Sequence, residues 1–372
     1  MPREEVHDVV VVGAGIGGLA AATALAAAGR DTVCLEARER VGGRALSTPA
    51  PGGALDLGAT WFWDGERRIA ELAARLGVET FDQHLAGDTV LQDVTGVHRL
   101  PGNLIDGPAR RFTAGADALA HGLAAELPAQ SLRLGTPVTA IRRSDKGDGG
   151  ALDVHTPDAV LHAEHVVLAV PPALALARID LGAELPAQLV RLARKTPVWM
   201  GAVAKVVAHY PGAFWREASL AGAAISRTGP LRELHDISGP GGRPAVLFGF
   251  APAQFVGPGF ENAARSQLGR LFGPAAAEPE SLRVQDWSDE HWTSPPAVHR
   301  LADYSLFGHD LYQQPALGGR LHWASTETAP DHTGHMEGAL AAAERAAHAV
   351  LSPSPTRAVP APWPLPTRTR GR

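Results

Sequence analysis

The pattern of apolar and polar residues is clearest near the start of the chain. Residues 9–12 are four valines in a row, a short β-branched run typical of a strand buried on both faces. A glycine-rich turn follows, and residues 19–28 are almost all helix-forming, with Gly29 as a natural stop. Residues 32–35 form a second apolar run, which Glu36 closes. This order predicts a β-α-β unit.

The same patterns predict the elements that follow. Apolar residues at helical spacing predict helices over residues 67–76 and 115–127, a helix that ends at 268–272, and an alanine-rich helix at the end of 321–349. Short apolar runs predict strands, and residues 145–150 read as a turn between two of them. The predicted strands are residues 136–141, 152–155, 165–172, 195–211 and 245–250.

These elements predict an α/β fold with two parts. We expect a discontinuous Rossmann-like dinucleotide-binding domain from residues 1–80, 110–180 and 285–350. A second, smaller α+β substrate domain would take residues 81–109 and 181–284. Residues 352–372 are rich in proline and arginine and lack apolar periodicity, which predicts a disordered tail.

The glycines after the first strand carry the first chemical signal. Gly13, Gly15 and Gly18 fit G-x-G-x-x-G, in which the first permits a tight turn, the second lets the backbone approach a pyrophosphate, and the third lets helix and strand pack closely. Glu36 lies where an acid binds a ribose hydroxyl, which disfavours NADP. The fingerprint does not separate FAD from NAD. Glycines used only for packing would leave Glu36 unexplained.

Composition narrows the function further. The 372 residues are 45% hydrophobic and carry a net charge of −5, so nothing indicates a nucleic-acid partner. The single cysteine, Cys34, falls in a predicted buried strand, which favours a reducing, cytoplasmic setting. The glycines in the apolar run 9–28 argue against a membrane span. His332 and His335 show no evident third ligand nearby, so we predict no metal.

Several blocks, in this order, resemble the flavin-containing amine oxidases, the monoamine oxidase-like family. They begin with the fingerprint and its continuation into a second glycine pair, Gly42 and Gly43, and they span most of the chain. The later blocks are residues 56–59, 166–172, 204–206, 211–216, 287–292, 321–328 and 334–339.

The resemblance implies a two-dinucleotide-binding-domain flavoprotein that binds FAD. The residues it places at the cofactor are Gly13, Gly15, Gly18, Glu36, Ala37, Arg38, Gly43, Arg44, Gly58, Ala59, Thr60, Val138, Ala169, Trp287, Glu327 and Met336. A helix that begins near Met336 would aim its positive dipole end at the flavin edge that becomes negative on reduction. The alternative is a helix that packs against the core without contacting a cofactor.

Lys205 is the candidate catalytic residue. It lies between Ala204 and Val206 in an apolar strand, and burial of a lysine lowers its pKa. The family analogue contacts flavin N5 through a water, so the resemblance places Lys205 beside the reacting centre. The alternative is a lysine whose ammonium reaches solvent from a strand end.

Two departures from the family pattern change the expected site. Members with covalent flavin carry a cysteine where this chain has residues 294–298 without one, so FAD should be non-covalent. Family members usually form an aromatic cage around the amine with two tyrosines, and this chain lacks both. The first position falls near Ala297 or Val298, and the second is occupied by His335. His335 would bind a polar group, transfer a proton or fill space. Trp61, Trp63 and Trp292 are candidate pocket walls, although large aromatic residues are more often core.

The resulting hypothesis is an FAD-dependent amine oxidase that acts on a small amine and dioxygen. A hydride would pass from the carbon beside a neutral amine to flavin N5, giving an imine and then hydrogen peroxide. Two alternatives stay open, a flavin desaturase or dehydrogenase acting on C–C bonds, and a flavin-binding protein without turnover. The stretch between Phe81 and Phe112 is shorter than in typical family members and lacks much of their helical insertion. The size and the lid of the substrate domain are therefore left open.

Overall fold

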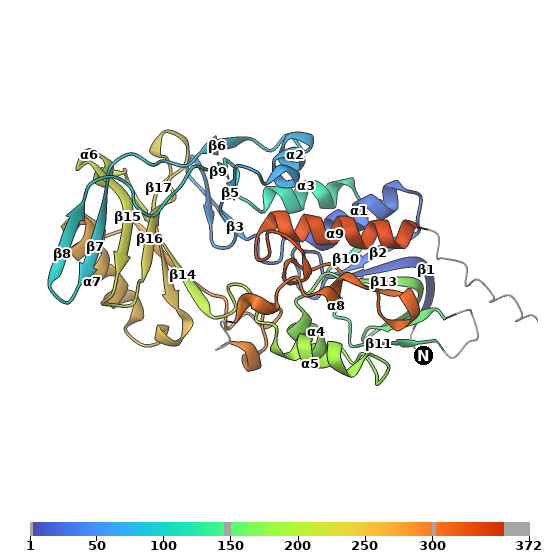
Figure 1. The fold of residues 1–372 in the computed structure, drawn as a ribbon. Coiled ribbons are helices and arrows are strands. Elements are labelled where there is room, and N and C mark those ends of the chain that lie inside the picture. Colours follow the sequence, from blue (N-terminus) through green and yellow to red (C-terminus); the bar gives the residue numbers. More distant parts are fainter. Residues whose placement is uncertain (1–2, 145–149, 300–302, 353–372) are drawn as a thin grey trace, which may run out of the picture.

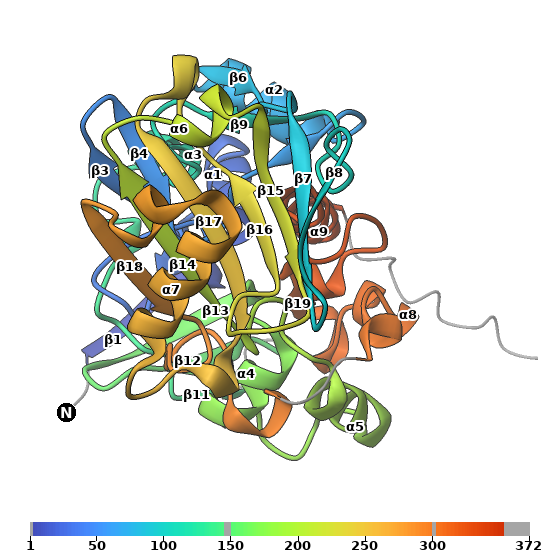
Figure 2. The same ribbon diagram turned by 90° about the vertical axis from the view of Figure 1, so that its left-hand side faces the viewer.

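A computed structural model describes residues 3–144, 150–299 and 303–352, which form two lobes, each built around a seven-stranded sheet (Figure 1). The first lobe carries helices on both faces of its sheet. The second has an antiparallel core with α7 (Phe260–Phe272) on its outer face (Figure 2). The predicted α/β class is therefore confirmed, and the second lobe has a mixed sheet of its own.

The predicted β-α-β unit lies at the centre of the first sheet. β1 pairs in parallel with both β2 and β13, and β19 continues the parallel pairing on β13. β11, β12 and β13 form an antiparallel meander, as the sequence predicts. The strands, in order, are β10 (Leu132–Arg133), β2 (Thr32–Leu35), β1 (Arg3–Val12), β13 (Ala159–Leu168), β12 (Leu152–His155) and β11 (Ala140–Arg143), with β19 (Leu321–Trp323) beside β13.

The four valines of β1 show why this strand is central. Val9 and Val11 face one cluster of helices, and Val10 and Val12 face the other side, because successive side chains on a strand point to opposite faces. Each fully buried side chain of this kind contributes roughly 1.5–3 kcal/mol. On the first side lie α1 (Ile16–Ala27), α2 (Arg67–Arg75), α3 (Ala118–Glu126) and α9 (Met336–Leu351); on the second lie α4 (Pro172–Arg178) and α5 (Ala187–Lys195).

The second sheet alternates in the same way. Val206 packs beneath α7 (Phe260–Phe272), whereas Val207 and Phe248 face the first lobe and pack against Leu55. The strands, in order, are β18 (Ser281–Asp286), β14 (Val203–Tyr210), β17 (Ala245–Pro252), β16 (Glu233–Asp236), β15 (Leu220–Ser226), β7 (Asp88–Asp93) and β8 (Gly96–Leu100). The short helix α6 (Phe214–Glu217) joins β14 to β15.

Two small sheets complete the arrangement around the junction of the lobes. The smaller elements are β3 (Ser47–Ala50) with β4 (Gly53–Asp56), β5 (Phe62–Trp63) and β6 (Thr80–Asp82) on either side of β9 (Ala109–Phe112), and the single-turn helix α8 (Asp310–Gln313). Among the residues described, no helix has the length and apolar character needed to cross a membrane.

Four predicted boundaries need correction. The strand expected over 136–141 begins at Ala140, because Pro137 has no N–H for a ladder. The strand expected over 165–172 runs from Ala159 to Leu168, and Pro171 instead caps α4. Residue 195 ends α5, so the strand expected over 195–211 begins at Val203. The helix expected from 115 begins at Ala118, after a glycine turn.

The placement of elements also bears on the expected division of the chain. Leu185, Leu189 and Leu192 pack in the core of the first sheet, whereas the sequence assigned residues 181–195 to the second domain. The residues of β7 and β8 join the second sheet. The division into domains itself stays a prediction. The predicted turn at 145–150 falls almost wholly, and the predicted tail at 352–372 almost entirely, outside the described residues.

Candidate active site

The turn between β1 and α1 is shaped by its glycines. Gly13 has a φ of +99°, a conformation that side chains other than glycine rarely adopt. A Cβ on Gly18 would lie 1.8 Å from the Gly13 carbonyl oxygen, so this glycine permits the contact of α1 with β1. A Cβ on Gly15 would meet nothing closer than 3.9 Å. Gly15 faces a cavity, and the N-terminus of α1 points its backbone N–H groups toward the same space.

Glu36 follows β2 and is 4% exposed. One carboxylate oxygen accepts a hydrogen bond from the Ala14 backbone N–H at 2.8 Å, and the other accepts from the Arg38 N–H at 2.9 Å. The acid therefore lies beside the glycine turn, as its spacing predicts. A small second cavity adjoins it and is lined in part by Ala37, Arg38 and Val138.

The second glycine pair is held against the first. A Cβ on Gly43 would lie 3.3 Å from the Gly15 Cα, so the two loops are in close contact. Arg44 then donates to both carboxylate oxygens of the fully buried Glu327, at 2.5 and 3.1 Å, and to the Trp199 carbonyl at 3.1 Å. The paired side chains fix this loop to the segment before α9.

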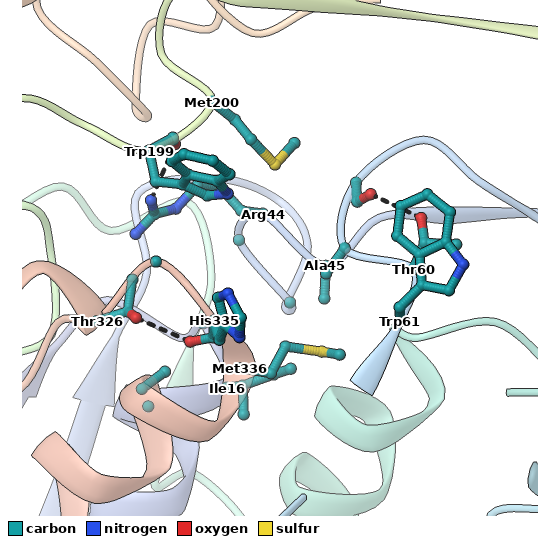
Figure 3. A pocket seen from close by; sticks show the side chains of 18 of the residues that line it. Ile16, Arg44, Ala45, Thr60, Trp61, Trp199, Met200, Thr326, His335 and Met336 are labelled. Atoms are coloured by element: carbon teal, nitrogen blue, oxygen red, sulfur yellow. Dashed lines mark hydrogen bonds between the residues drawn. The ribbon is translucent and has the colours of Figure 1, made fainter. Parts of the chain in front are cut away.

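A cavity of about 350 Å³ runs from the glycine turn to the second sheet. Figure 3 shows its middle, where Trp199 lies near Arg44, Trp61 stands at the opposite side, and His335 lies on the side of Trp199, next to Met336. Many of the predicted residues line it, so the fold brings together segments more than three hundred residues apart. Those residues are Gly13, Gly15, Glu36, Arg38, Gly43, Arg44, Gly58, Ala59, Thr60, Trp61, Ala169, Lys205, Trp292, His335 and Met336.

Lys205 lies in the interior of β14, paired with Phe250 on one side and Gln285 on the other, and is 1% exposed. Its Nζ donates to the Gly58 carbonyl at 2.5 Å and to Thr60 Oγ1 at 2.8 Å. It also lies 4.3 Å from the centroid of the Phe248 ring. Lys205 therefore connects the second sheet to the loop of the first lobe that lines the cavity, and it does not reach solvent.

Burial lowers the pKa of Lys205 to about 7, against which the Asp56 carboxylate acts in the opposite direction. Burial likewise raises the pKa of Asp56, and the Arg111 guanidinium, 3.9 Å away, opposes that shift. The expected fall in the lysine pKa is confirmed in direction. A lysine of this kind exchanges its proton near neutral pH, which an exposed lysine does not do.

Five of the expected cofactor residues lie off the main cavity. Gly18 is a packing position, and Glu327 lies behind Arg44. Ala37 and Val138 line only the small second cavity, next to Glu36. Trp287 is fully buried and donates from Nε1 to the Leu57 carbonyl at 3.0 Å, so it supports the loop beneath the cavity.

His335 has a partner that the sequence did not reveal. Glu66, 3% exposed, accepts a hydrogen bond from the His335 Nδ1 at 2.5 Å and lies 3.5 Å from the His332 Nδ1. The Trp63 ring lies 5.0 Å from the His335 ring. No pattern in the sequence joins position 66 to position 335, because the contact depends on how α2 packs against α9.

Glu66 corrects the expectation that the two histidines lack a third possible ligand. Donor atoms of Glu66, His332 and His335 lie within 4.8 Å of one another. The hydrogen bond between Glu66 and His335 already engages two of these atoms, and the positive end of the α9 dipole opposes a cation beside its N-terminus. We therefore interpret Glu66 and His335 as a hydrogen-bonded pair with His332 beside it.

The far end of the cavity, beneath the second sheet, carries a second charged cluster. The His235 Nδ1 lies 2.6 Å from an Asp106 oxygen, and its Nε2 lies 3.1 Å from a Glu233 oxygen. Burial opposes protonation of His235, but the contacts with the two carboxylates outweigh it and raise the pKa of this histidine. Two acids with one imidazolium leave the immediate surroundings of His235 negative, a charge that the sequence did not predict.

The glycine turn, the acid after β2 and the long cavity with a buried lysine define a dinucleotide-binding oxidoreductase of two lobes. The chain belongs to the flavin-containing amine oxidoreductase family, whose model matches residues 86–351. Residues 11–76 match a NAD(P)-binding Rossmann-like domain. The family named from the sequence is therefore confirmed, and with it the class of enzyme.

Individual relatives are more distant. The putrescine oxidase of Kocuria rosea is 26% identical over 462 residues, which cover 93% of this chain and 95% of that protein. An L-amino acid dehydrogenase of Synechocystis sp. is 32% identical over 251 residues, which cover 64% of this chain and 50% of that protein. The solved structure of cyclohexylamine oxidase from Brevibacterium oxydans covers 92% of this chain and 98% of its own, with a TM-score of 0.79 and 23% identity.

The alignment with the putrescine oxidase is longer than this chain. Since it extends over 462 residues and this chain has 372, that relative contains segments with no counterpart here. Residues 101–108, between β8 and β9, supply Ile105, Asp106 and Gly107 to the cavity wall. A short segment thus forms part of the wall at the far end.

Proposed function

We propose that this protein is an FAD-dependent amine oxidase. FAD supplies the hydride acceptor, so that oxidation of the carbon beside the amine gives an imine, and dioxygen then takes the electrons to form hydrogen peroxide. The single observation that carries the proposal is Lys205, a buried lysine in the wall of a cavity that begins at the dinucleotide turn.

The residues present fit FAD along the length of the cavity. The open space above Gly15, next to the N-terminus of α1, suits a pyrophosphate. The Glu36 carboxylate suits a ribose hydroxyl, and the small cavity beside Val138 suits the adenine. At the other end, the N-terminus of α9 at Met336 offers backbone N–H groups and a positive dipole end to the flavin ring.

The bonding of Lys205 suits a group that acts on what enters the cavity. An ammonium has three N–H donors, and among the described residues Nζ has the two acceptors Gly58 and Thr60. The remaining N–H, or the lone pair after loss of a proton, is free for a water or for dioxygen in the cavity. We assign to Lys205 the role of assisting the reaction of dioxygen with reduced FAD.

The cavity also favours a cationic substrate. Near its far end, Asp106 and Glu233 flank the single charge of His235, and the local negative charge attracts ammonium groups. This agrees with the names of the relatives, which include an oxidase of a diamine and a dehydrogenase of amino acids. The second of these keeps one alternative open, a dehydrogenase that passes electrons to an acceptor other than dioxygen. A desaturase acting on C–C bonds is the other.

The test is anaerobic bleaching of the flavin spectrum against a panel of monoamines, diamines and amino acids. We expect at least one amine to reduce the flavin, and admission of air to restore its spectrum with one hydrogen peroxide per flavin reduced. Bleaching with slow reoxidation in air would favour the dehydrogenase. Bleaching by no amine, although dithionite reduces the flavin, would exclude the proposal.

The same preparation tests whether FAD is bound without a covalent bond. Residues 294–298 contain no cysteine, and Cys34 lies fully buried in β2, where burial raises the pKa of its thiol. We expect acid precipitation to release all the FAD into the supernatant. Flavin that stays with the precipitated chain would contradict this assignment.

A further inference from the structure

We propose that His335 is the base that takes a proton from the ammonium form of the substrate, and that Glu66 positions it for this role. The inference rests on the proposed amine oxidation. It begins from a chemical requirement, since a hydride leaves the carbon only when the neighbouring nitrogen has a free electron pair. An alkylammonium has a pKa of about 10.4, so at pH 7 roughly one molecule in 2,500 is neutral.

His335 lies where such a base is needed. It precedes α9, lines the cavity, and in Figure 3 its ring projects into the space between Trp199 and Met336. Met336, the first residue of α9, lines the same cavity. A side chain that leaves the helix N-terminus at this point reaches both the proposed flavin edge and the amine.

Glu66 determines which nitrogen of His335 carries the proton. An ionised carboxylate only accepts hydrogen bonds, so the Nδ1 at 2.5 Å carries the proton and Nε2 keeps its lone pair. The other Glu66 oxygen accepts from the Trp63 backbone N–H at 2.9 Å, which fixes the carboxylate. The Trp63 ring packs on the imidazole and restricts its rotation.

Charged groups of both signs surround His335. The Glu66 carboxylate lies at its Nδ1, and the positive end of the α9 dipole lies beside it. His332 lies 3.5 Å from the same carboxylate, Arg44 is paired with Glu327, and Lys205, Asp106 and His235 share the cavity.

The step is a single proton transfer. The N–H bond of the substrate ammonium breaks, its electron pair stays on nitrogen, and the proton forms a bond with the His335 Nε2. Oxidation then proceeds from the neutral amine, and the imidazolium later loses its proton to water. The enzyme thereby draws on the abundant charged form of its substrate.

The decisive variant is His335→Gln, followed by anaerobic stopped-flow measurement of flavin reduction at pH 7 and pH 10. We expect the second-order rate constant to fall by about 100-fold or more at pH 7, the size of effect usual for a placed base. At pH 10 it should lie within a few-fold of the wild type, because the free amine is then plentiful. An equal loss at both pH values would show a purely structural role and overturn the inference.

Glu66→Gln tests the positioning role, because an amide can donate as well as accept and no longer selects one tautomer. We expect a loss of about 10-fold at pH 7, smaller than that of His335→Gln. Long-range ¹H–¹⁵N spectra of the imidazoles give a readout that needs no substrate. The wild type should show His335 with its proton on Nδ1, identified by the signal missing from His335→Gln. A proton on Nε2 would overturn the inference.

His332→Ala is the matched control. It removes an imidazole beside the same carboxylate but outside the cavity lining, so flavin reduction should keep the wild-type pH dependence. The outcomes separate the two proposals. If no amine reduces the wild-type flavin at any pH, the proposed function fails. If an amine does so and His335→Gln matches the wild type throughout, only the role of His335 fails.

Discussion

The two ends of the cavity expose different parts of the chain. At the dinucleotide end the functional surface is main chain, held in place by Gly13, Gly15 and Gly18, and one acid, Glu36, completes it. At the end beneath the second sheet the surface is made of side chains, with Lys205, His235 and their partners buried among aromatic rings.

The difference concerns what each end can tolerate. Backbone N–H and C=O groups offer fixed dipoles without the cost of burying a charge. A cofactor can approach them closely only where no side chain stands in the way. A buried charge offers reactivity and a shifted pKa, but it requires partners such as the Gly58 carbonyl and Asp56. Substitutions at the first end should therefore affect folding and cofactor binding, and those at the second should affect rates and pH dependence.

The largest effect should come from Gly18→Ala, with Gly15→Ala as its matched control. The added methyl at 18 meets a main-chain oxygen at 1.8 Å, so we expect a loss of more than about 3 kcal/mol of stability and no FAD retained. The methyl at 15 has 3.9 Å of space, so the fold should survive while FAD affinity falls by more than about 10-fold. Urea unfolding and flavin titration measure the two. Equal behaviour of the variants would contradict our account of the turn.

Lys205→Met should change the chemistry while FAD stays bound. The variant keeps the length of the side chain and removes its proton donors, and we expect the reaction of the reduced enzyme with dioxygen to slow by about 10- to 1000-fold. Double-mixing stopped flow separates this step from flavin reduction. Lys195→Met, at the exposed end of α5, is the control and should match the wild type. Wild-type rates in both half-reactions of Lys205→Met would make Lys205 a structural residue.

Glu36→Ala should weaken FAD binding by about 1.5–3 kcal/mol, the contribution of a hydrogen bond to a charged group. It also leaves the Ala14 and Arg38 backbone N–H groups without their carboxylate partner, which adds to the loss. Fluorescence titration of the apoprotein measures the change. Unchanged affinity would mean that the acid supports the turn and does not contact the ribose.

The last expected effect concerns the pH dependence of stability. The unfolded chain holds the Lys205 proton up to about pH 10.5, whereas the folded chain releases it above about pH 7. Between these values the unfolded state binds more protons, so this lysine makes stability rise with pH by roughly 1.4 kcal/mol per unit. Urea unfolding at pH 7.5 and 9.5 should show a smaller rise in Lys205→Met than in the wild type. Parallel curves would contradict the shifted pKa.

The same contrast explains what could be predicted from sequence. The β1–α1–β2 unit is local, so the spacing of Gly13, Gly18 and Glu36 was sufficient to place it. Lys205 was identifiable because a charge interrupts an apolar strand. The partner of His335 was not, because Glu66 is 269 residues away and reaches it only through helix packing. Asp106 and His235 likewise meet only after the strands of the second sheet are paired.

The position of α9 has a consequence for synthesis of the protein. Its first turn lines the cavity, and its apolar face packs on α1, the helix that opens the dinucleotide site. A chain emerging from the ribosome presents the glycine turn first but obtains the opposite wall of the cavity only after residue 351. The nascent chain therefore cannot enclose its cofactor until residue 351 has been made, and until then the face of α1 that packs on α9 stays uncovered.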